Sequence, residues 1–199
     1  QHPLYAVAKD NYISPPTLPD IDRLPSTLTV SPVKNILLGS FAIILEHTTL
    51  EEILKVTNTG MIYHSGDAGA SQYWICYTIS SNGQQERIWL TSGELGGTHH
   101  TIGQFYAAVI PKAAKSSASC PEISSRLRPL LIGSLPSLGA DSGQLKRSIG
   151  NPSGEIDGWQ FYSYNGELSD KRFEQLAIFG AHISGGKIIG LYASQATTN

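Results

Sequence analysis

The sequence predicts an α+β protein made of two tandem units, each with short helices packed on one face of an antiparallel sheet. Three observations lead to this prediction. A capped amphipathic helix precedes an aromatic hairpin in the first half, and the second half repeats the order of strand, capped helix and aromatic strand. Apolar residues make up 40% of the chain and charged residues 15%, a balance that suits a packed core and not a disordered chain.

The predicted organisation has four segments: an N-terminal arm at 1–33, a first helix-on-sheet unit at 34–112, a linker at 113–127 and a second unit at 128–199. The arm contains six of the eleven prolines. Proline fixes φ and lacks the amide donor, so the arm is neither a helix nor a central strand. We expect an extended segment that lies on the domain or is partly disordered.

The first unit is expected to begin with one strand over residues 34–46 and a helix of two to three turns. Two overlapping capping boxes open the helix, Thr48 with Glu51 and Thr49 with Glu52. Its apolar residues recur on one helical face, and Gly60 is expected to end it.

An aromatic hairpin is the clearest element of the sequence. Residues 73–79 are aromatic and β-branched, Asn82-Gly83 is a strong signal for a two-residue turn, and residues 86–91 return as the second strand. The turn sets a register that places Tyr77 opposite Ile88 and Cys76 opposite Trp89. One face is then uniformly apolar and is expected to pack on the helix, whereas the other face mixes aromatic and polar residues and is expected to be partly exposed. The members of the second face are Trp74, Cys76, Thr78, Arg87, Trp89 and Thr91.

The rest of the chain continues the same pattern. A glycine-rich stretch at 92–103 precedes a third strand at 104–110, and a linker of small and polar residues follows at 111–126. The second half offers a strand at 130–132, a helix that Asp141–Gln144 caps and Gly150 terminates, and strands at 159–164, 173–182 and 187–193. The alternative to two diverged copies of one unit is that two α+β halves resemble each other by chance.

The second half resembles a known structural family. Residues 138–152, 158–164 and 184–191 are similar to the unit of two helices on an antiparallel sheet in β-lactamase-inhibitory proteins and SmpA/OmlA outer-membrane assembly lipoproteins. Residues 45–79 match it more loosely, and the Tyr-Trp-x-Cys-Tyr strand also resembles secreted proteobacterial proteins of unknown function. The acylated N-terminal cysteine of the lipoproteins is absent, so membrane anchoring does not carry over. No inhibitor residue carries over either, because no motif fixes the binding residues of that fold.

The resemblance implies a protein that works through its surface, with the helix-free sheet face contacting a partner protein. On that face Trp74, Trp89 and Arg87 are the candidate contact residues, because Trp and Arg are enriched at binding hot spots. The other interpretation is that these tryptophans cover the linker or pack against the other half. The predicted function is an exported, non-enzymatic binding protein, either inhibitor-like or an accessory of envelope assembly.

The two cysteines allow two interpretations. Cys76 and Cys120 are either buried free thiols of a cytosolic protein or one disulfide in an oxidising compartment. We expect the disulfide, because Cys120 lies in a polar linker where a free thiol would be exposed. The first residue is Gln1, which fits either a removed signal peptide or a trimmed chain, and the low lysine content fits export. The expected location is therefore periplasmic or secreted.

An enzyme is the second candidate function. Glu94, His99 and His100 on the glycine-rich loop are weak candidates for a metal site of a small hydrolase or metal-binding protein. Adjacent histidines on an extended chain point in opposite directions, and no HExxH helix or G-x-S-x-G elbow occurs. We therefore expect no cofactor. The net charge of −2 argues against a nucleic-acid partner, and no apolar run is long enough to span a membrane.

Overall fold

The computed structural model describes residues 5–7, 13–81, 83–114, 116–168 and 172–199, and these residues form a nine-stranded sheet, a three-stranded sheet and two α-helices. All neighbouring strands pair antiparallel except the edge pair β1–β4. The large sheet contains, in spatial order, β1 (Tyr5–Val7), β4 (Ile62–Ser65), β5 (Gln72–Ser81), β6 (Gln84–Ser92), β7 (Gln104–Ile110), β12 (Lys187–Thr198), β11 (Glu174–Ser184), β10 (Trp159–Glu167) and β9 (Gly154–Ile156).

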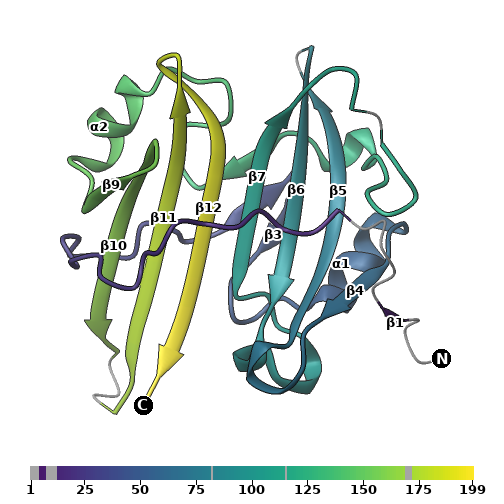
Figure 1. Cartoon of the computed structure of the whole chain (residues 1–199), viewed down its shortest axis with the longest axis horizontal. Helices are drawn as coiled ribbons and strands as arrows, with labels where there is room; N and C mark the ends of the chain where they lie inside the picture. Colours follow the sequence, from purple (N-terminus) through teal and green to yellow (C-terminus); the bar gives the residue numbers. More distant parts are fainter. Residues whose placement is uncertain (1–4, 8–12, 82, 115, 169–171) are drawn as a thin grey trace.

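The second layer lies behind the large sheet in Figure 1 and consists of both α-helices and the small sheet. Its elements are α1 (Leu50–Thr57), α2 (Gly143–Ile149), β3 (Phe41–Ile43), β2 (Ile36–Leu38) and β8 (Leu130–Ile132), and three short 3₁₀ turns lie at Ala68–Ala70, Glu94–His99 and Ser125–Leu127. The structure is therefore mostly antiparallel sheet with few short helices, which agrees with the predicted mixture of helix and sheet. Among the described residues, no helix has the length and apolar character needed to cross a membrane.

The predicted hairpin register is confirmed. Tyr77 pairs with Ile88 and Cys76 with Trp89 in the β5–β6 ladder. Gly83 adopts a positive φ of 75° at the turn, a conformation that glycine tolerates without strain, whereas Asn82 lies outside the described residues. The apolar face of the hairpin joins the main core, in which Leu50 and Ile53 of α1 are fully buried. The hairpin face and the helix thus pack together as the alternation of residues predicts.

The prediction of one strand over 34–46 is wrong, because β2 and β3 form a hairpin there. Gly39 adopts φ 59° between them, and a Cβ at this position would lie 2.4 Å from the Arg126 carbonyl oxygen. A strand cannot run through such a residue, so the chain turns. β2 then pairs with β8 from the second half, so the small sheet joins segments about ninety residues apart.

Helix α1 begins with one of the two predicted capping boxes. The Thr49 hydroxyl accepts a hydrogen bond from the Glu52 amide at 3.2 Å, and the Glu52 carboxylate accepts one from the Thr49 amide at 2.8 Å. The Thr48–Glu51 box is wrong, because the Thr48 hydroxyl instead accepts a hydrogen bond from the Ile44 amide. The helix also ends earlier than predicted, at Asn58 in the left-handed conformation.

The strands of the second half and the end of its helix follow the prediction, whereas the start of the helix differs, because Ser142 and not Asp141 is the N-cap residue and its side chain makes no capping hydrogen bond. Helix α2 ends at Gly150, and the Asp141 carboxylate accepts a hydrogen bond from the Gly143 amide at 2.9 Å. The predicted strands at 159–164, 173–182 and 187–193 correspond to β10, β11 and β12. β12 pairs with β7, so both halves of the chain contribute to one continuous sheet.

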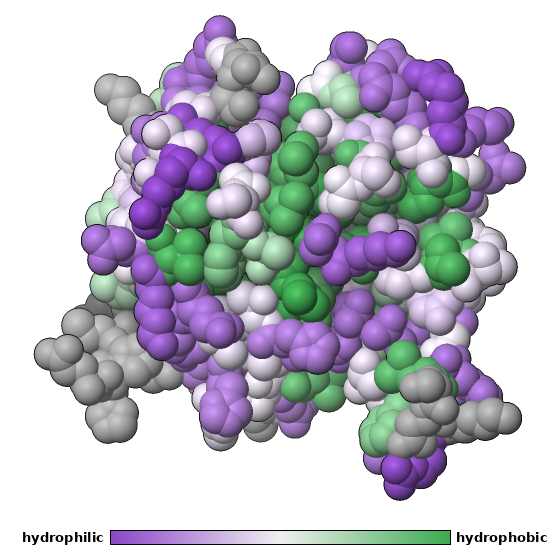
Figure 2. All heavy atoms as spheres, turned by 180° about the vertical axis from the view of Figure 1, so that it is seen from behind, coloured by the Kyte–Doolittle hydropathy of each residue, from purple (hydrophilic) through white to green (hydrophobic). Residues whose placement is uncertain are grey.

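The two layers leave the large sheet with one covered and one helix-free face. Viewed from behind, apolar residues gather near the middle of the layer that contains the small sheet (Figure 2). Leu37, Ala42 and Leu131 are cross-strand neighbours there and are all at least partly exposed. On the opposite side of the molecule, the N-terminal arm crosses the helix-free face of the large sheet (Figure 1).

Candidate functional site

The helix-free face has a continuous row of side chains that crosses both halves of the sheet. Cys76 pairs with Trp89, Trp89 with Tyr106, and Tyr106 with Tyr192. These residues belong to one apolar cluster that also contains Trp74, Phe161 and Ile178. Alternation along the strands explains the row, because every second residue points to this face.

The candidate contact residues of this face are not exposed as expected. Trp74 is 1% exposed and Trp89 is 5% exposed, and Arg87 is half-buried. Burial lowers the pKa of the Arg87 guanidinium from its ordinary value, and its Nε has no hydrogen-bond partner among the described residues. The expectation of a partly exposed face around these tryptophans is therefore wrong, because other parts of the chain cover them.

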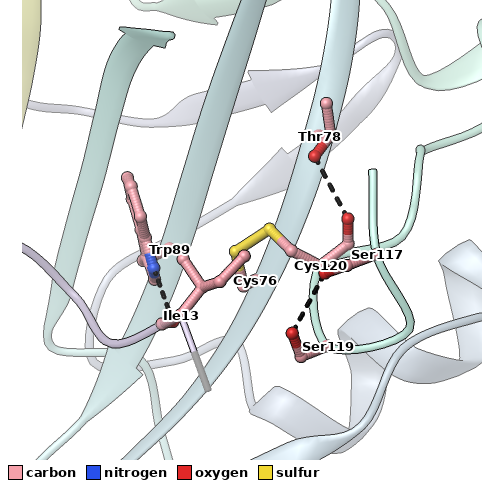
Figure 3. Close-up of a disulfide and its surroundings, with 7 residues drawn as sticks. All are labelled: Ile13, Cys76, Thr78, Trp89, Ser117, Ser119 and Cys120. Atoms are coloured by element: carbon pink, nitrogen blue, oxygen red, sulfur yellow. Dashed lines mark hydrogen bonds between the residues drawn. A yellow bond between two sulfur atoms is a disulfide. The ribbon is translucent and has the colours of Figure 1, made fainter. Parts of the chain in front are cut away.

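One cover is the linker, which the disulfide attaches to the sheet. Cys76 and Cys120 form the predicted bridge (Figure 3). Beyond it, the linker runs beside β5, where the Thr78 amide donates to the Pro121 carbonyl at 2.9 Å and the Ile123 amide donates to the Thr78 carbonyl at 3.0 Å. The Thr78 hydroxyl also donates to the Cys120 carbonyl at 3.1 Å. The linker thus closes one side of the helix-free face.

The other cover is the N-terminal arm, residues 13–33. The Trp89 indole donates a hydrogen bond to the Ile13 carbonyl at 3.0 Å at one end of the arm (Figure 3). At the other end, the amides of Thr27 and Leu28 both donate to the Ser163 carbonyl at 3.1 Å. The segment between these anchors contains Leu18, Ile21 and Leu24, which pack on the aromatic cluster. Residues 13–33 of the arm therefore lie on the sheet, in contact with the aromatic cluster.

The arm does not fill the face, and a groove of about 830 Å³ remains beside it. We call this cavity the arm groove. Its floor is the sheet itself, and one wall is the arm. The opposite wall is the glycine-rich loop from Gly93 to Gly103. The floor residues are Gln104, Tyr106, Ser163, Leu176, Ile178, Tyr192, Ser194 and Ala196. The volume lies within the range typical of ligand-binding clefts.

The two tyrosines of the floor form a buried pair. The ring centroids of Tyr106 and Tyr192 are 4.9 Å apart. Burial raises the pKa of Tyr106, and the neighbouring Tyr192 raises it further. Burial also raises the pKa of Tyr192, so both phenols stay neutral at physiological pH. The pair therefore adds no charge to the floor, and only 6% of Tyr106 and 3% of Tyr192 is exposed.

Carboxylates from three separate segments line the same groove. Asp22 comes from the arm, Glu46 from the turn before α1, and Glu94 from the glycine-rich loop. Glu46 is held in place by β12, because it accepts hydrogen bonds from the Thr197 amide at 2.6 Å and from the Gln195 amide nitrogen at 2.9 Å. Asp22 and Glu94 are exposed. Within the described part of the chain, the groove lining contains no Lys, Arg or His.

The weak metal candidates do not converge. His99 and Glu94 are exposed, whereas His100 is buried with Nδ1 2.9 Å from the Glu51 carboxylate and its ring 4.2 Å from that of Tyr73. No cluster of three or more His, Cys, Asp or Glu side chains with metal-binding geometry occurs among the described residues. Of these candidates, Glu94 alone contributes to the arm groove.

Most residues of the groove were not among the site residues that the sequence suggested. A signal for Tyr106 and Gln104 was present, because alternation in the strand 104–110 places both on one face. Asp22 and Glu46 gave no such signal, because each lies in an irregular segment whose course over the sheet cannot be predicted from alternation. No known family matches this chain, and neither a curated protein nor a solved structure shows significant similarity to it.

Proposed function

We propose that this chain is an exported, non-enzymatic binding protein that takes up a segment of a partner protein in the arm groove. The observation that carries the proposal is the groove itself, an open cavity of about 830 Å³ on the helix-free face with an apolar and aromatic floor. Convergent polar groups on an apolar floor are the usual composition of a binding site. The role is either inhibitor-like or that of an envelope-assembly accessory.

The topology supports a function of this kind. The segments α1–β4–β5–β6–β7 and α2–β9–β10–β11–β12 have the same order, and their strands occupy mirrored positions in the sheet order. We infer two diverged copies of one helix-on-sheet unit, joined through their last strands β7 and β12. Two copies joined in this way produce one wide helix-free face, which suits recognition of a partner surface.

The disulfide supports an exported location. Cys76 and Cys120 are both buried, and bonds of this kind persist in oxidising compartments such as the periplasm or the extracellular space. The contact surface in this proposal differs from the one that the sequence suggested. Because Trp74 and Trp89 are buried under the chain's own segments, the contact surface moves to the arm groove, where Leu176 is exposed and Leu18 is partly exposed.

A peptide-display selection tests the proposal. A random peptide library is selected on the wild-type protein and on Ala196→Trp, which places an indole in the groove. Ala42→Trp makes the same change at an exposed position of the small sheet, on the other layer, and serves as the matched control. All three proteins are first compared by thermal unfolding and circular dichroism.

We expect peptides that bind wild type and Ala42→Trp equally and bind Ala196→Trp at least tenfold more weakly, a difference of about 1.4 kcal/mol. The proposal is overturned if no peptide is enriched on the wild type. It is equally overturned if the enriched peptides bind Ala196→Trp as tightly as the wild type, because their site then lies outside the groove.

A further inference from the structure

We infer that the segment bound in the arm groove is an extended polypeptide with apolar side chains and at least one lysine or arginine. This inference rests on the proposed function and specifies the chemistry of the partner. Three features lead to it: the charge of the groove lining, the apolar residues in that lining, and the kind of chain that the same face already holds.

The charge of the lining is one-sided. Asp22, Glu46 and Glu94 contribute three carboxylates, and the described lining has no basic residue to neutralise them. These carboxylates come from three different segments of the chain, so the negative charge of the lining is not confined to one element. The ring pair on the floor is neutral because burial raises the pKa of both tyrosines. An acidic ligand would meet like charge throughout, whereas a cationic group is attracted from several sides.

Part of the groove lining is apolar. Leu176, Ile178 and Ala196 line it from β11 and β12, and Leu18 and Ile21 line it from the arm. A compact inorganic cation would leave this surface in contact with water. A lysine or arginine side chain flanked by apolar residues matches both properties, since its charged end reaches the carboxylates while its neighbours cover the apolar floor.

The face also demonstrates that it accommodates extended polypeptide. The arm itself lies across it without forming a strand, and it is anchored by hydrogen bonds at its two ends and by apolar packing between them. The groove runs beside this segment and shares its apolar residues. A second extended chain placed there would contact the sheet floor, the arm and the glycine-rich loop at once.

Charge-matched peptides test the inference. The probes are a blocked hexapeptide of sequence Leu-Lys-Leu-Pro-Lys-Leu and two versions in which both lysines are replaced by glutamine or by glutamate. Binding is measured by isothermal titration on wild type, Asp22→Asn and Glu94→Gln. Asp157→Asn removes a carboxylate at the exposed turn before Trp159, outside the groove, and is the matched control.

We expect the lysine peptide to bind about tenfold more tightly than the glutamine peptide and the glutamate peptide not to bind at about 1 mM. Asp22→Asn and Glu94→Gln should each weaken the lysine peptide by about threefold and leave the glutamine peptide unchanged, because exposed pairs contribute about 0.2–1 kcal/mol. Asp157→Asn should leave the affinities of both the lysine peptide and the glutamine peptide unchanged. Raising the salt from about 0.05 to about 0.5 M should remove most of the difference between the peptides.

Equal binding of the three peptides, or no binding by the lysine peptide, overturns the inference that the bound segment contains a lysine or arginine. The library selection described above separates this failure from failure of the proposed function. If the selected peptides depend on the groove but are neutral or acidic, the chain is a groove-binding protein whose ligand is not basic. If no groove-dependent peptide is selected, both proposals fail.

Discussion

The Trp89 indole nitrogen donates a 3.0 Å hydrogen bond to the carbonyl oxygen of Ile13, a residue 76 positions earlier in the chain. This bond attaches the start of the described arm to the middle of the helix-free face. It explains how a tryptophan on an otherwise uncovered sheet face is only 5% exposed. It also makes the arm part of the binding face, since the same arm forms one wall of the groove.

The substitution Trp89→Phe should loosen the arm while preserving most of the ring packing. Loss of one hydrogen bond to a part-buried carbonyl should lower the free energy of unfolding by about 1 kcal/mol. Trypsin cleavage after Arg23, an exposed arm residue, should accelerate about fivefold, the factor that corresponds to the same free energy. Cleavage after Lys112, at the start of the linker, is the internal control. If cleavage accelerates equally at both sites, the substitution destabilises the whole fold, and Trp89 does not specifically hold the arm in place.

The disulfide should contribute strongly to stability. Cys76 and Cys120 are 44 residues apart, and closing a loop of this size stabilises a fold by about 4 kcal/mol in the chain-entropy model. The double variant Cys76→Ser/Cys120→Ser should lower the free energy of urea unfolding by an amount approaching that value. A reducing agent should destabilise the wild type and have no effect on the double variant. Detection of two reactive thiols in the native, non-reduced protein would contradict the bond.

The elements that sequence patterns predicted well are those that depend on neighbours in the chain. The register of β5 and β6 followed from a two-residue turn, and the Thr49–Glu52 capping box followed from residues three apart. Both depend on short-range geometry that residue type alone restricts strongly. The same holds for the end of α2 at Gly150.

The features that escaped prediction depend on contacts between distant segments. No local signal indicates that β2 pairs with β8, because short apolar strands have many possible partners. The burial of Trp89 depends on the path of a proline-rich segment whose apolar residues have no strand or helix period. The groove could not be predicted for the same reason, since Asp22, Glu46 and Glu94 line it from three irregular segments that are far apart in the sequence.

The N-terminal cap of α1 offers a comparison within the same chain. Thr49→Ala removes the hydrogen bond that the Thr49 hydroxyl accepts from the Glu52 amide, one of the two bonds of the capping box, and should lower the free energy of unfolding by about 1 kcal/mol. Ser142 occupies the same position at α2, but its side chain makes no capping hydrogen bond. Ser142→Ala should therefore change stability by less than about 0.5 kcal/mol. Equal losses in urea unfolding for the two variants would contradict this difference.

Buried tyrosines should make the fold sensitive to alkaline pH. Burial raises the pKa of Tyr77, Tyr106 and Tyr192 above the ordinary value of 10.0, and it raises the pKa of Tyr162 to about 12. In the unfolded chain these phenols ionise near pH 10, whereas in the folded protein they remain protonated. Unfolding above pH 10 therefore releases protons, so the contribution of these tyrosines to the free energy of unfolding is constant below this pH and falls as the pH rises toward 12.

Each buried tyrosine should contribute about 1.4 kcal/mol of lost stability per pH unit in that window. Together these residues should weaken the fold steeply as the pH rises from 10 toward 12. Urea unfolding at several pH values measures the slope, and tyrosinate absorbance should rise together with loss of circular dichroism. Tyr106→Phe should reduce the slope above pH 10 by the contribution of one tyrosine while leaving the pH dependence between about 7 and 9 unchanged. If tyrosinate instead forms fully near pH 10 while the dichroism of the sheet persists, these side chains ionise in the folded protein, and the burial of their phenols is refuted.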